Sequence, residues 1–155
     1  MNNDTFNIII VGTGGQGLIT LTRVLAAAAM AEGLDVKTSE LHGLSQRGGS
    51  VETHVRFGKE VHSPLVAQAG ADLIISLELQ ETVRACYYSH RERTVFLVNN
   101  FIVPIATENK AVSIKHSPSE FNNFSKKTLF IPATKLVKEH IDNPVLSGTF
   151  MISLA

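Results

Sequence analysis

The 155-residue sequence has a single cysteine, Cys86, so a disulfide within the chain is excluded. One cysteine also cannot supply the several thiolates of a multi-cysteine zinc site or an iron–sulfur cluster. Neither sign of charge predominates, because 14 lysines and arginines balance 14 aspartates and glutamates. A chain without net charge has no overall field that attracts nucleic acid or anionic lipid, so we expect neither partner. The cysteine usage fits a reducing cytoplasm.

The sequence also lacks an apolar run that could form a membrane-spanning helix at either end. The polar residues Met1–Thr5 precede the apolar run Phe6–Val11 without a basic region or a cleavage site, which predicts a strand and not a signal peptide. The apolar tail Val145–Ala155 would rise only about 16 Å as a helix, roughly half a bilayer core. This tail has no helix stop signal, so either the chain is truncated there or the tail docks on a partner.

Strand and helix patterns alternate along the chain. Continuous apolar runs predict buried strands, and a run rich in alanine and leucine predicts a helix that Gly33 closes. In chain order, the predictions are a strand at Phe6–Val11, a helix at Leu18–Ala31, and strands at Asp35–Glu40, Ala71–Leu77 and Thr94–Val98. The alternation predicts one α/β domain over residues 1–155, built on a Rossmann-like, doubly wound and mostly parallel sheet.

One segment alternates in a different way and predicts a hairpin insertion. Val51–Phe57 places apolar residues against polar ones, which predicts a strand with one solvent-facing side that includes His54. Gly58 and Lys59 then predict a turn into Val61, and so a β-hairpin.

The remaining patterns are weaker. A polar helix is expected from about Gln80 to His90, a strand at Thr128–Ile131 and a short helix at Thr134–Ile141. Asn99–Ser125 contains prolines and many polar residues, and we assign no function to the chain beyond Asn100.

The loop after the first predicted strand has the G-x-G-x-x-G spacing of nucleotide-binding loops. Such glycines permit a tight turn, a close approach of backbone N–H groups to a diphosphate, and a helix dipole that faces the anion. In a nicotinamide site, Glu40 would hold the ribose hydroxyls. The alternative is that the glycines serve only the turn and helix packing, and the pattern slightly favours this alternative. The phosphate-loop candidates are Gly12, Gly14, Gly15, Gln16 and Gly17.

A second glycine-containing segment, Ser39–Ser50, lies where open α/β sheets bind ligands, at the carboxyl end of a predicted strand. Gln46 and Arg47, followed by Gly48 and Gly49, give a planar fork of donors on backbone that can approach a carboxylate or phosphate closely. A solvent-facing arginine on a surface loop is an equally good interpretation from chemistry alone.

The combination of motifs resembles the catalytic-domain family of 2-oxoacid:ferredoxin oxidoreductases. Four stretches carry the resemblance: Val11–Gly17 (VGTGGQG), Glu40–Gly43 (ELHG), Gln46–Ser50 (QRGGS) and Ser63–Leu65 (SPL). The His-Gly followed by Gln-Arg-Gly-Gly resembles the beta subunit of the indolepyruvate type. The resemblance covers the chain up to about Asn100, and the ending within an apolar stretch departs from relatives that continue with a further helix.

The resemblance implies a small, cluster-free subunit that is inactive alone. Enzymes of this family decarboxylate a 2-oxoacid on thiamine diphosphate, pass electrons through iron–sulfur clusters to ferredoxin and release an acyl-coenzyme A. The chain lacks the family's Gly-Asp-Gly and downstream Asn pattern for magnesium and thiamine diphosphate, so a larger alpha-type partner is expected to carry these cofactors and the clusters. Coenzyme A is expected at the interface. The candidates for the substrate, coenzyme A or partner site are Glu40, His42, Gln46, Arg47, Gly48 and Gly49.

No metal ligand or catalytic residue is assigned within the isolated chain. The spacings of His42, His54 and His62 do not match a helix-borne metal pair, and Cys86 is expected to be a buried, inert thiol. His42 either hydrogen-bonds within its loop or faces the partner's cofactor.

Two other functions compete with the subunit interpretation. A stand-alone nicotinamide-dependent dehydrogenase would use the glycine loop and Glu40, but little sequence beyond Asn100 remains for a substrate domain. A non-enzymatic nucleotide-binding module would use the same loop for an adenine nucleotide. Binding of nicotinamide nucleotides, of adenosine phosphates alone or of neither distinguishes the three interpretations.

Overall fold

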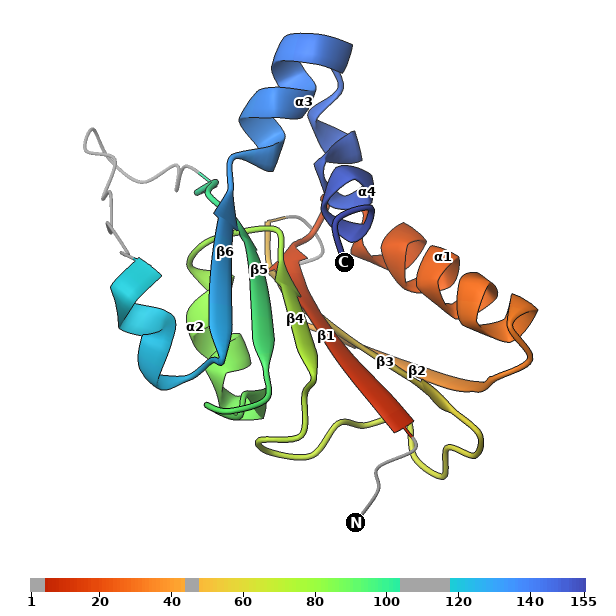
Figure 1. Cartoon of the computed structure of the whole chain (residues 1–155). Coiled ribbons are helices and arrows are strands. Elements are labelled where there is room, and N and C mark those ends of the chain that lie inside the picture. Colours follow the sequence, from red (N-terminus) through yellow and green to blue (C-terminus); the bar gives the residue numbers. More distant parts are fainter. Residues whose placement is uncertain (1–4, 44–47, 104–117) are drawn as a thin grey trace.

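A computed structural model of the chain describes residues 5–43, 48–103 and 118–155, and these form a six-stranded sheet with helices on both faces (Figure 1). The strand order is β2-β3-β1-β4-β5-β6. The strands are β1 (Thr5–Thr13), β2 (Asp35–His42), β3 (Ser50–Gly58), β4 (Leu73–Ser76), β5 (Val95–Asn99) and β6 (Lys127–Ile131). The α-helices are α1 (Leu18–Ala31), α2 (Glu81–Ala85), α3 (Ala133–Ile141) and α4 (Ser147–Ile152). Three short 3₁₀ turns are η1 (Cys86–Tyr88), η2 (Pro118–Asn123) and η3 (Pro144–Leu146).

The parallel part of the sheet confirms the predicted α/β fold class. β1, β4, β5 and β6 pair in parallel, and their apolar side chains feed two hydrophobic clusters. One cluster joins the sheet to α1 and α4, for instance through Leu21 and Met151, and the other joins it to the α2 side through Ala85. β1 lies inside the sheet, and its residues Ile8–Val11 are almost completely buried. This explains why the strongest apolar run of the sequence became the central strand.

The predicted hairpin at Gly58 and Lys59 is wrong. β3 lies between β1 and β2 and is antiparallel to both, so the antiparallel insertion is formed by β2 and β3. Both edges of β3 are thus occupied, and no third strand could pair with it through a turn at Gly58. Val61 is not in a strand; its backbone N–H donates instead to the Asp35 carboxylate at 2.9 Å.

The prediction that His54 faces solvent is also wrong. The side of β3 that carries His54 is covered by the segment 59–70, and the His54 side chain is only 1% exposed. The backbone N–H of Val66 donates to its Nδ1 at 3.1 Å. Arg56 holds the same segment, because one guanidinium nitrogen donates to the carbonyls of Ser63 and Leu65 at 2.7 and 3.2 Å. The Ser63–Leu65 motif therefore covers β3 in this structure.

The later elements agree with the sequence in part. The strand at Thr128–Ile131 and the helix at Thr134–Ile141 are confirmed as β6 and α3. The predicted helix Gln80–His90 is shorter, because α2 passes into η1 and the chain becomes extended at Ser89, whose hydroxyl donates to the Cys86 carbonyl at 2.8 Å.

The apolar tail packs against its own domain. Met151 in α4 is completely buried, and Gly148 lies so close to α1 that an added Cβ would come within 2.5 Å of Leu21. Within the described ranges, no helix is long and apolar enough to cross a membrane.

The hydrogen bonds of Arg56 predict that its guanidinium group contributes measurably to the free energy of unfolding. Its Nε donates to the Asn7 side chain at 2.7 Å while a second nitrogen holds the Ser63 and Leu65 carbonyls. Arg56→Lys keeps the charge but cannot make all three bonds, so we expect a loss of about 1 to 2 kcal/mol in the free energy of unfolding. Urea unfolding measures this loss, and amide exchange should become faster around Val66.

The matched control is Arg91→Lys on an exposed turn, which should change the free energy of unfolding by less than about 0.5 kcal/mol. Equal stability of the two variants would show that the fork does not hold the 59–70 segment.

Candidate functional site

The glycine loop between β1 and α1 is closed by one of its own side chains. The Gln16 Oε1 accepts a hydrogen bond from the Thr13 N–H at 2.8 Å, and its Nε2 donates to the Leu77 carbonyl at 3.2 Å. The Gln16 N–H donates to the Thr13 carbonyl at 3.2 Å. Gln16 thus joins the glycine loop, which follows β1, to Leu77 at the end of the neighbouring strand β4. These contacts favour a packing role for the loop.

Three glycines of the loop are required by geometry. Gly15 and Gly17 have φ angles of 100° and 80°, a region that side-chain-bearing residues rarely adopt. A Cβ on Gly12 would lie 2.6 Å from the Gln16 Oε1 and 3.2 Å from side-chain atoms of Leu18 and Leu77. Gly12 therefore leaves room for the Gln16 side chain. No contact in the structure tests phosphate binding by this loop, which stays a prediction.

The second predicted loop lies directly against the first. The Gly14 N–H donates to the Gly49 carbonyl at 2.8 Å, and the Gly43 N–H donates to the Ser50 carbonyl at 3.0 Å. Gly48 has a φ of 67°, which explains a glycine there. The two motifs that carry the family resemblance are thus neighbours in space. Gln46 and Arg47 lie outside the described residues.

Two hollows flank these loops, and His42 lines both. The larger, of about 450 Å³, is bounded by the glycine loop, the first turn of α1 and Val51. The smaller, of about 280 Å³, contains Ser50, Glu52, Glu81 and Arg84. We call them the glycine-loop hollow and the Glu52 hollow. Glu40, the predicted ribose ligand, is exposed on β2 and lines neither of them.

Glu52 is held in a fixed orientation by two donors, the buried His54 and the half-buried Tyr88. Its Oε1 accepts hydrogen bonds from the Tyr88 hydroxyl at 2.7 Å and from the His54 Nε2 at 3.0 Å. Because the His54 Nδ1 accepts from a backbone N–H, the ring carries its proton on Nε2. Burial alone would raise the pKa of Glu52, but these hydrogen bonds outweigh burial and hold it below the ordinary value of 4.5. Glu52 is therefore ionised at neutral pH.

The other charged groups of the Glu52 hollow come from α2. Glu81 accepts a hydrogen bond from the Ser50 hydroxyl at 2.5 Å and lies 3.7 Å from Arg84. The N–H of Glu81 donates to the carboxylate of Glu78, which is 2% exposed and also accepts from the Val103 N–H. Burial raises the pKa of Glu78. Two carboxylates against one guanidinium make this hollow better suited to a cation than to an anion.

The sequence analysis did not identify the charged residues of the Glu52 hollow, which are Glu52, Glu81 and Arg84. Glu52 was visible only as one polar position of an alternating strand, and Glu81 and Arg84 as polar residues of a predicted helix. Their meeting depends on the antiparallel pairing of β3 with β1, in which Ser50 lies opposite Thr13. An alternating pattern does not contain that register.

The structure supplies few elements for metal or thiol chemistry. Among the described residues, no group of three or more histidines, cysteines, aspartates or glutamates could hold a metal ion. Cys86 is half-buried, and burial raises the pKa of its thiol to about 11, so it is protonated at neutral pH. This agrees with the inert thiol expected from the sequence.

Comparison with known proteins adds a consistent set of relatives. Residues 7–155 match the family model described as pyruvate ferredoxin/flavodoxin oxidoreductase. The chain is 47% identical over 98 residues to indolepyruvate oxidoreductase subunit IorB of Archaeoglobus fulgidus, a match that covers 63% of this chain and 48% of the relative. It is 38% identical over 140 residues to subunit IorB of Pyrococcus horikoshii, and this match covers 86% of this chain and 68% of the relative. The matched part is thus about half the length of the Archaeoglobus relative.

Solved structures give the same fold. The pyruvate oxidoreductase subunit PORC of Thermotoga maritima is similar with a TM-score of 0.68 at 18% identity, covering 96% of this chain and 73% of that one. A 2-oxoglutarate:ferredoxin oxidoreductase of Magnetococcus marinus has a TM-score of 0.67 at 18% identity, and the match covers 95% of this chain and 23% of that one. At 18% identity, these two structures establish a similar fold only.

The hydrogen bonds to Glu52 predict a specific pH dependence of stability. Because its pKa in the folded protein lies below the unfolded value of about 4.5, ionised Glu52 stabilises the fold at neutral pH, and this contribution is lost as the pH falls below that value. Glu52→Gln should lower the free energy of unfolding by about 1 to 2 kcal/mol at neutral pH and flatten its decline toward about pH 3. Urea unfolding across this pH range provides the measurement.

Glu60→Gln serves as the control, since the Glu60 side chain is 77% exposed, and it should leave both quantities unchanged. An acid dependence of Glu52→Gln identical to that of the unaltered protein would contradict the depressed pKa of Glu52.

Proposed function

Because the chain belongs to the pyruvate ferredoxin/flavodoxin oxidoreductase family, we propose that it is the small subunit of a 2-oxoacid:ferredoxin oxidoreductase. Its substrate in this proposal is indolepyruvate or another aryl pyruvate. The observation that carries the choice is the 38–47% identity to proteins named indolepyruvate oxidoreductase subunit IorB. A relative named as a common subunit of pyruvate and ketoisovalerate oxidoreductases is only 25% identical.

The donor set of the chain does not fit the redox cofactors of such an enzyme. One cysteine cannot hold an iron–sulfur cluster, and the described residues contain no candidate metal group. In the proposal, a larger alpha-type subunit holds thiamine diphosphate, magnesium and the clusters, and ferredoxin receives the electrons from that subunit. The present chain completes the active site during oxidative decarboxylation to an acyl-coenzyme A, in the cytoplasm.

The two hollows suggest how this chain could contribute. The described residues that line the glycine-loop hollow include no carboxylate, and the hollow lies at the positive end of α1, so it is the better place for an anionic group of coenzyme A or the substrate. The Glu52 hollow has the opposite preference. His42 borders both, and its exposed ring can donate a hydrogen bond to a ligand in either.

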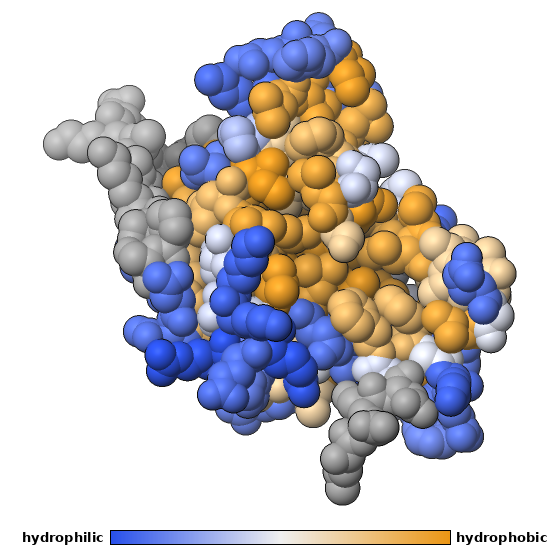
Figure 2. Space-filling view, in the orientation of Figure 1, coloured by the Kyte–Doolittle hydropathy of each residue, from blue (hydrophilic) through white to orange (hydrophobic). Residues whose placement is uncertain are grey.

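The apolar outer surface of α1 is consistent with a partner subunit that covers it. α1 has only one charged residue, Arg23, and its outward side chains include Ile19, Val24 and Met30, which are 38–65% exposed. Figure 2 shows apolar residues across the face that carries α1 and α4. Helices without a polar outer face are usually covered, so this surface fits an obligate subunit better than a free enzyme.

The competing functions lose support from the same geometry. A nicotinamide dehydrogenase or a nucleotide-binding module needs the glycine-loop N–H groups for phosphate, yet the Thr13 and Gly14 N–H groups donate to Gln16 and Gly49. Glu40 lines neither hollow. Both functions predict nucleotide binding by the isolated chain, and the subunit proposal predicts none.

Purification from native cells under mild conditions tests the proposal. An affinity-tagged chain should recover a larger protein at equal stoichiometry that contains iron and thiamine diphosphate, whereas the chain purified alone should contain neither. Recovery of the chain without such a protein, or stoichiometric iron in the isolated chain, would end the proposal.

The sequence-predicted residue Arg47 allows a sharper test within the assembled enzyme. If its guanidinium meets an anion of substrate or coenzyme A, Arg47→Lys loses the two-pronged geometry while it keeps the charge. We expect a loss of about 1.5 to 3 kcal/mol, or roughly ten- to a hundredfold in kcat/KM, with assembly intact. Kinetics in which the 2-oxoacid and coenzyme A are varied separately identify the affected ligand, and unchanged values for both would remove Arg47 from the site.

A further inference from the structure

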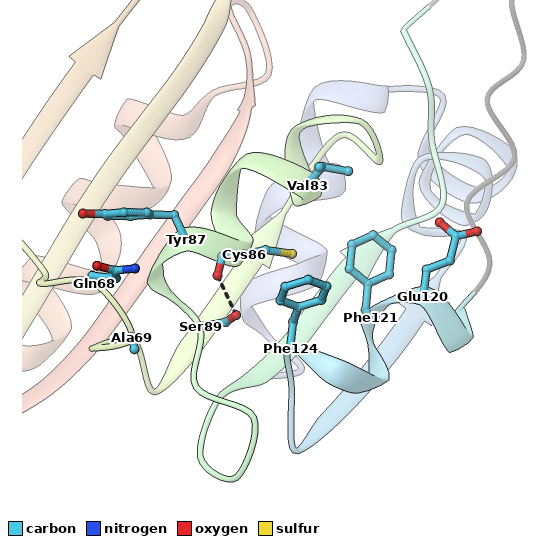
Figure 3. Close-up of a pocket in the computed structure, with 9 residues that line it drawn as sticks. All are labelled: Gln68, Ala69, Val83, Cys86, Tyr87, Ser89, Glu120, Phe121 and Phe124. Carbon is cyan, nitrogen blue, oxygen red and sulfur yellow. Dashed lines mark hydrogen bonds between the residues drawn. The ribbon is translucent and has the colours of Figure 1, made fainter.

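A hollow of about 620 Å³, separate from the two described above, lies between α2 with η1 on one side and η2 on the other (Figure 3). Three large apolar side chains in its lining are strongly exposed: Val83 at 51%, Tyr87 at 57% and Phe124 at 45%. Exposed side chains of this size are ordinarily scattered over a surface. Their clustering around one hollow therefore indicates a ligand-binding site.

The floor of this hollow is part of the hydrophobic core. Phe121 is only 3% exposed, and its ring centroid lies 6.1 Å from that of Phe96 and 6.0 Å from that of Phe130. Figure 3 shows the rings of Phe121 and Phe124 and the sulfur of Cys86 turned toward the same space. The burial that raises the pKa of Cys86 to about 11 keeps this sulfur uncharged. The interior is thus apolar and aromatic.

The wall opposite these rings is held in a strained conformation. Ala69 has a φ of 54°, which is unfavourable for a residue with a side chain. Its N–H donates to the Tyr87 carbonyl at 3.2 Å, and its carbonyl accepts from Arg93 at 2.9 Å. Gln68, next to Ala69, and Ser89 add polar side chains to the lining, and the Ser89 hydroxyl donates to the Cys86 carbonyl at 2.8 Å. A rigid wall with a few polar groups is typical of a preformed ligand pocket.

We propose that this hollow binds a free, uncharged aromatic molecule of one or two rings. Its volume falls in the range of small-molecule sites, about 300 to 1,000 Å³. Phe121, Phe124 and Tyr87 offer stacked and edge-to-face contacts, which distinguish an aromatic from a saturated ring. Among the described residues that line the hollow, none is a lysine, arginine or histidine and Glu120 contributes a carboxylate, so these residues favour an uncharged ring over an aryl carboxylate.

A free molecule fits the surroundings better than an aromatic side chain of a partner protein. The residues next to its lining in the sequence include the exposed polar residues Asn122, Asn123 and His90, so the apolar surface is confined to the hollow and does not extend into the wider apolar patch that a protein partner would cover. The inference does not use the proposed function, and it would stand if the chain had no larger partner.

Two properties of the chain allow a clean measurement. It has no tryptophan, so the fluorescence of added indole reports binding without a protein background, and its only cysteine lies inside the hollow. Indole should bind with one-to-one stoichiometry and, at saturation, slow the alkylation of Cys86 by N-ethylmaleimide about tenfold. Cyclohexanol should bind about tenfold more weakly than indole because its saturated ring offers no aromatic face. Indole-3-acetate should also bind about tenfold more weakly, because it carries a negative charge.

Phe124→Ser tests the site directly, with Phe6→Ser as a control of the same residue type and similar exposure, 43% against 45%, on another part of the surface. Phe124→Ser should weaken indole binding about tenfold with the circular dichroism unchanged, and Phe6→Ser should leave it unchanged. The proposal is overturned if indole neither binds nor protects Cys86, if both variants weaken binding equally, or if cyclohexanol binds as well as indole. Tenfold tighter binding of N-acetyltryptophanamide than of indole would identify a partner's side chain as the occupant. That result would overturn the proposal that the occupant is a free molecule.

Discussion

The antiparallel pairing of β3 with β1 determines the geometry of the glycine-loop end of the sheet. Nine residues of each strand are in register, from Thr5 opposite Gly58 to Thr13 opposite Ser50. This register brings Ser50 and Glu52 beside the glycine loop, and it allows the Gly49 carbonyl to accept from Gly14. A one-residue slip would turn Glu52 to the opposite face of the sheet and leave the hollow with Glu81 as its remaining carboxylate.

The same end of the sheet carries the loop with the glycine spacing of nucleotide-binding loops. Gln16 uses both ends of its amide to bind Thr13 and Leu77, so the loop is held by the protein itself. The chain can therefore keep the glycine spacing and the helix behind it without the nicotinamide chemistry that the spacing suggests. With one cysteine, the chain alone cannot supply the several thiolates of an iron–sulfur cluster.

Local patterns predicted local structure well, and failed where distant segments meet. The strand at Phe6–Val11, the glycine loop and the helix behind it follow from neighbouring residues, and the structure has them as β1 and α1. His54 was misplaced because the 59–70 segment that covers it leaves no mark on an alternating strand. The role of Gln16 could not be predicted either, since Leu77 lies 61 residues away. Of the predicted site residues, the structure brings His42, Gly14 and Gly49 together and leaves Glu40 outside.

We propose that this chain completes an active site whose cofactors belong to a larger subunit. Titration of the purified chain into the separately purified larger subunit, with ferredoxin reduction by indolepyruvate and coenzyme A as the readout, tests it most directly. We expect negligible turnover by either protein alone, and activity that rises linearly and saturates at one chain per larger subunit. Full activity of the larger subunit without the chain, or no gain at any ratio while the two proteins bind, would contradict it.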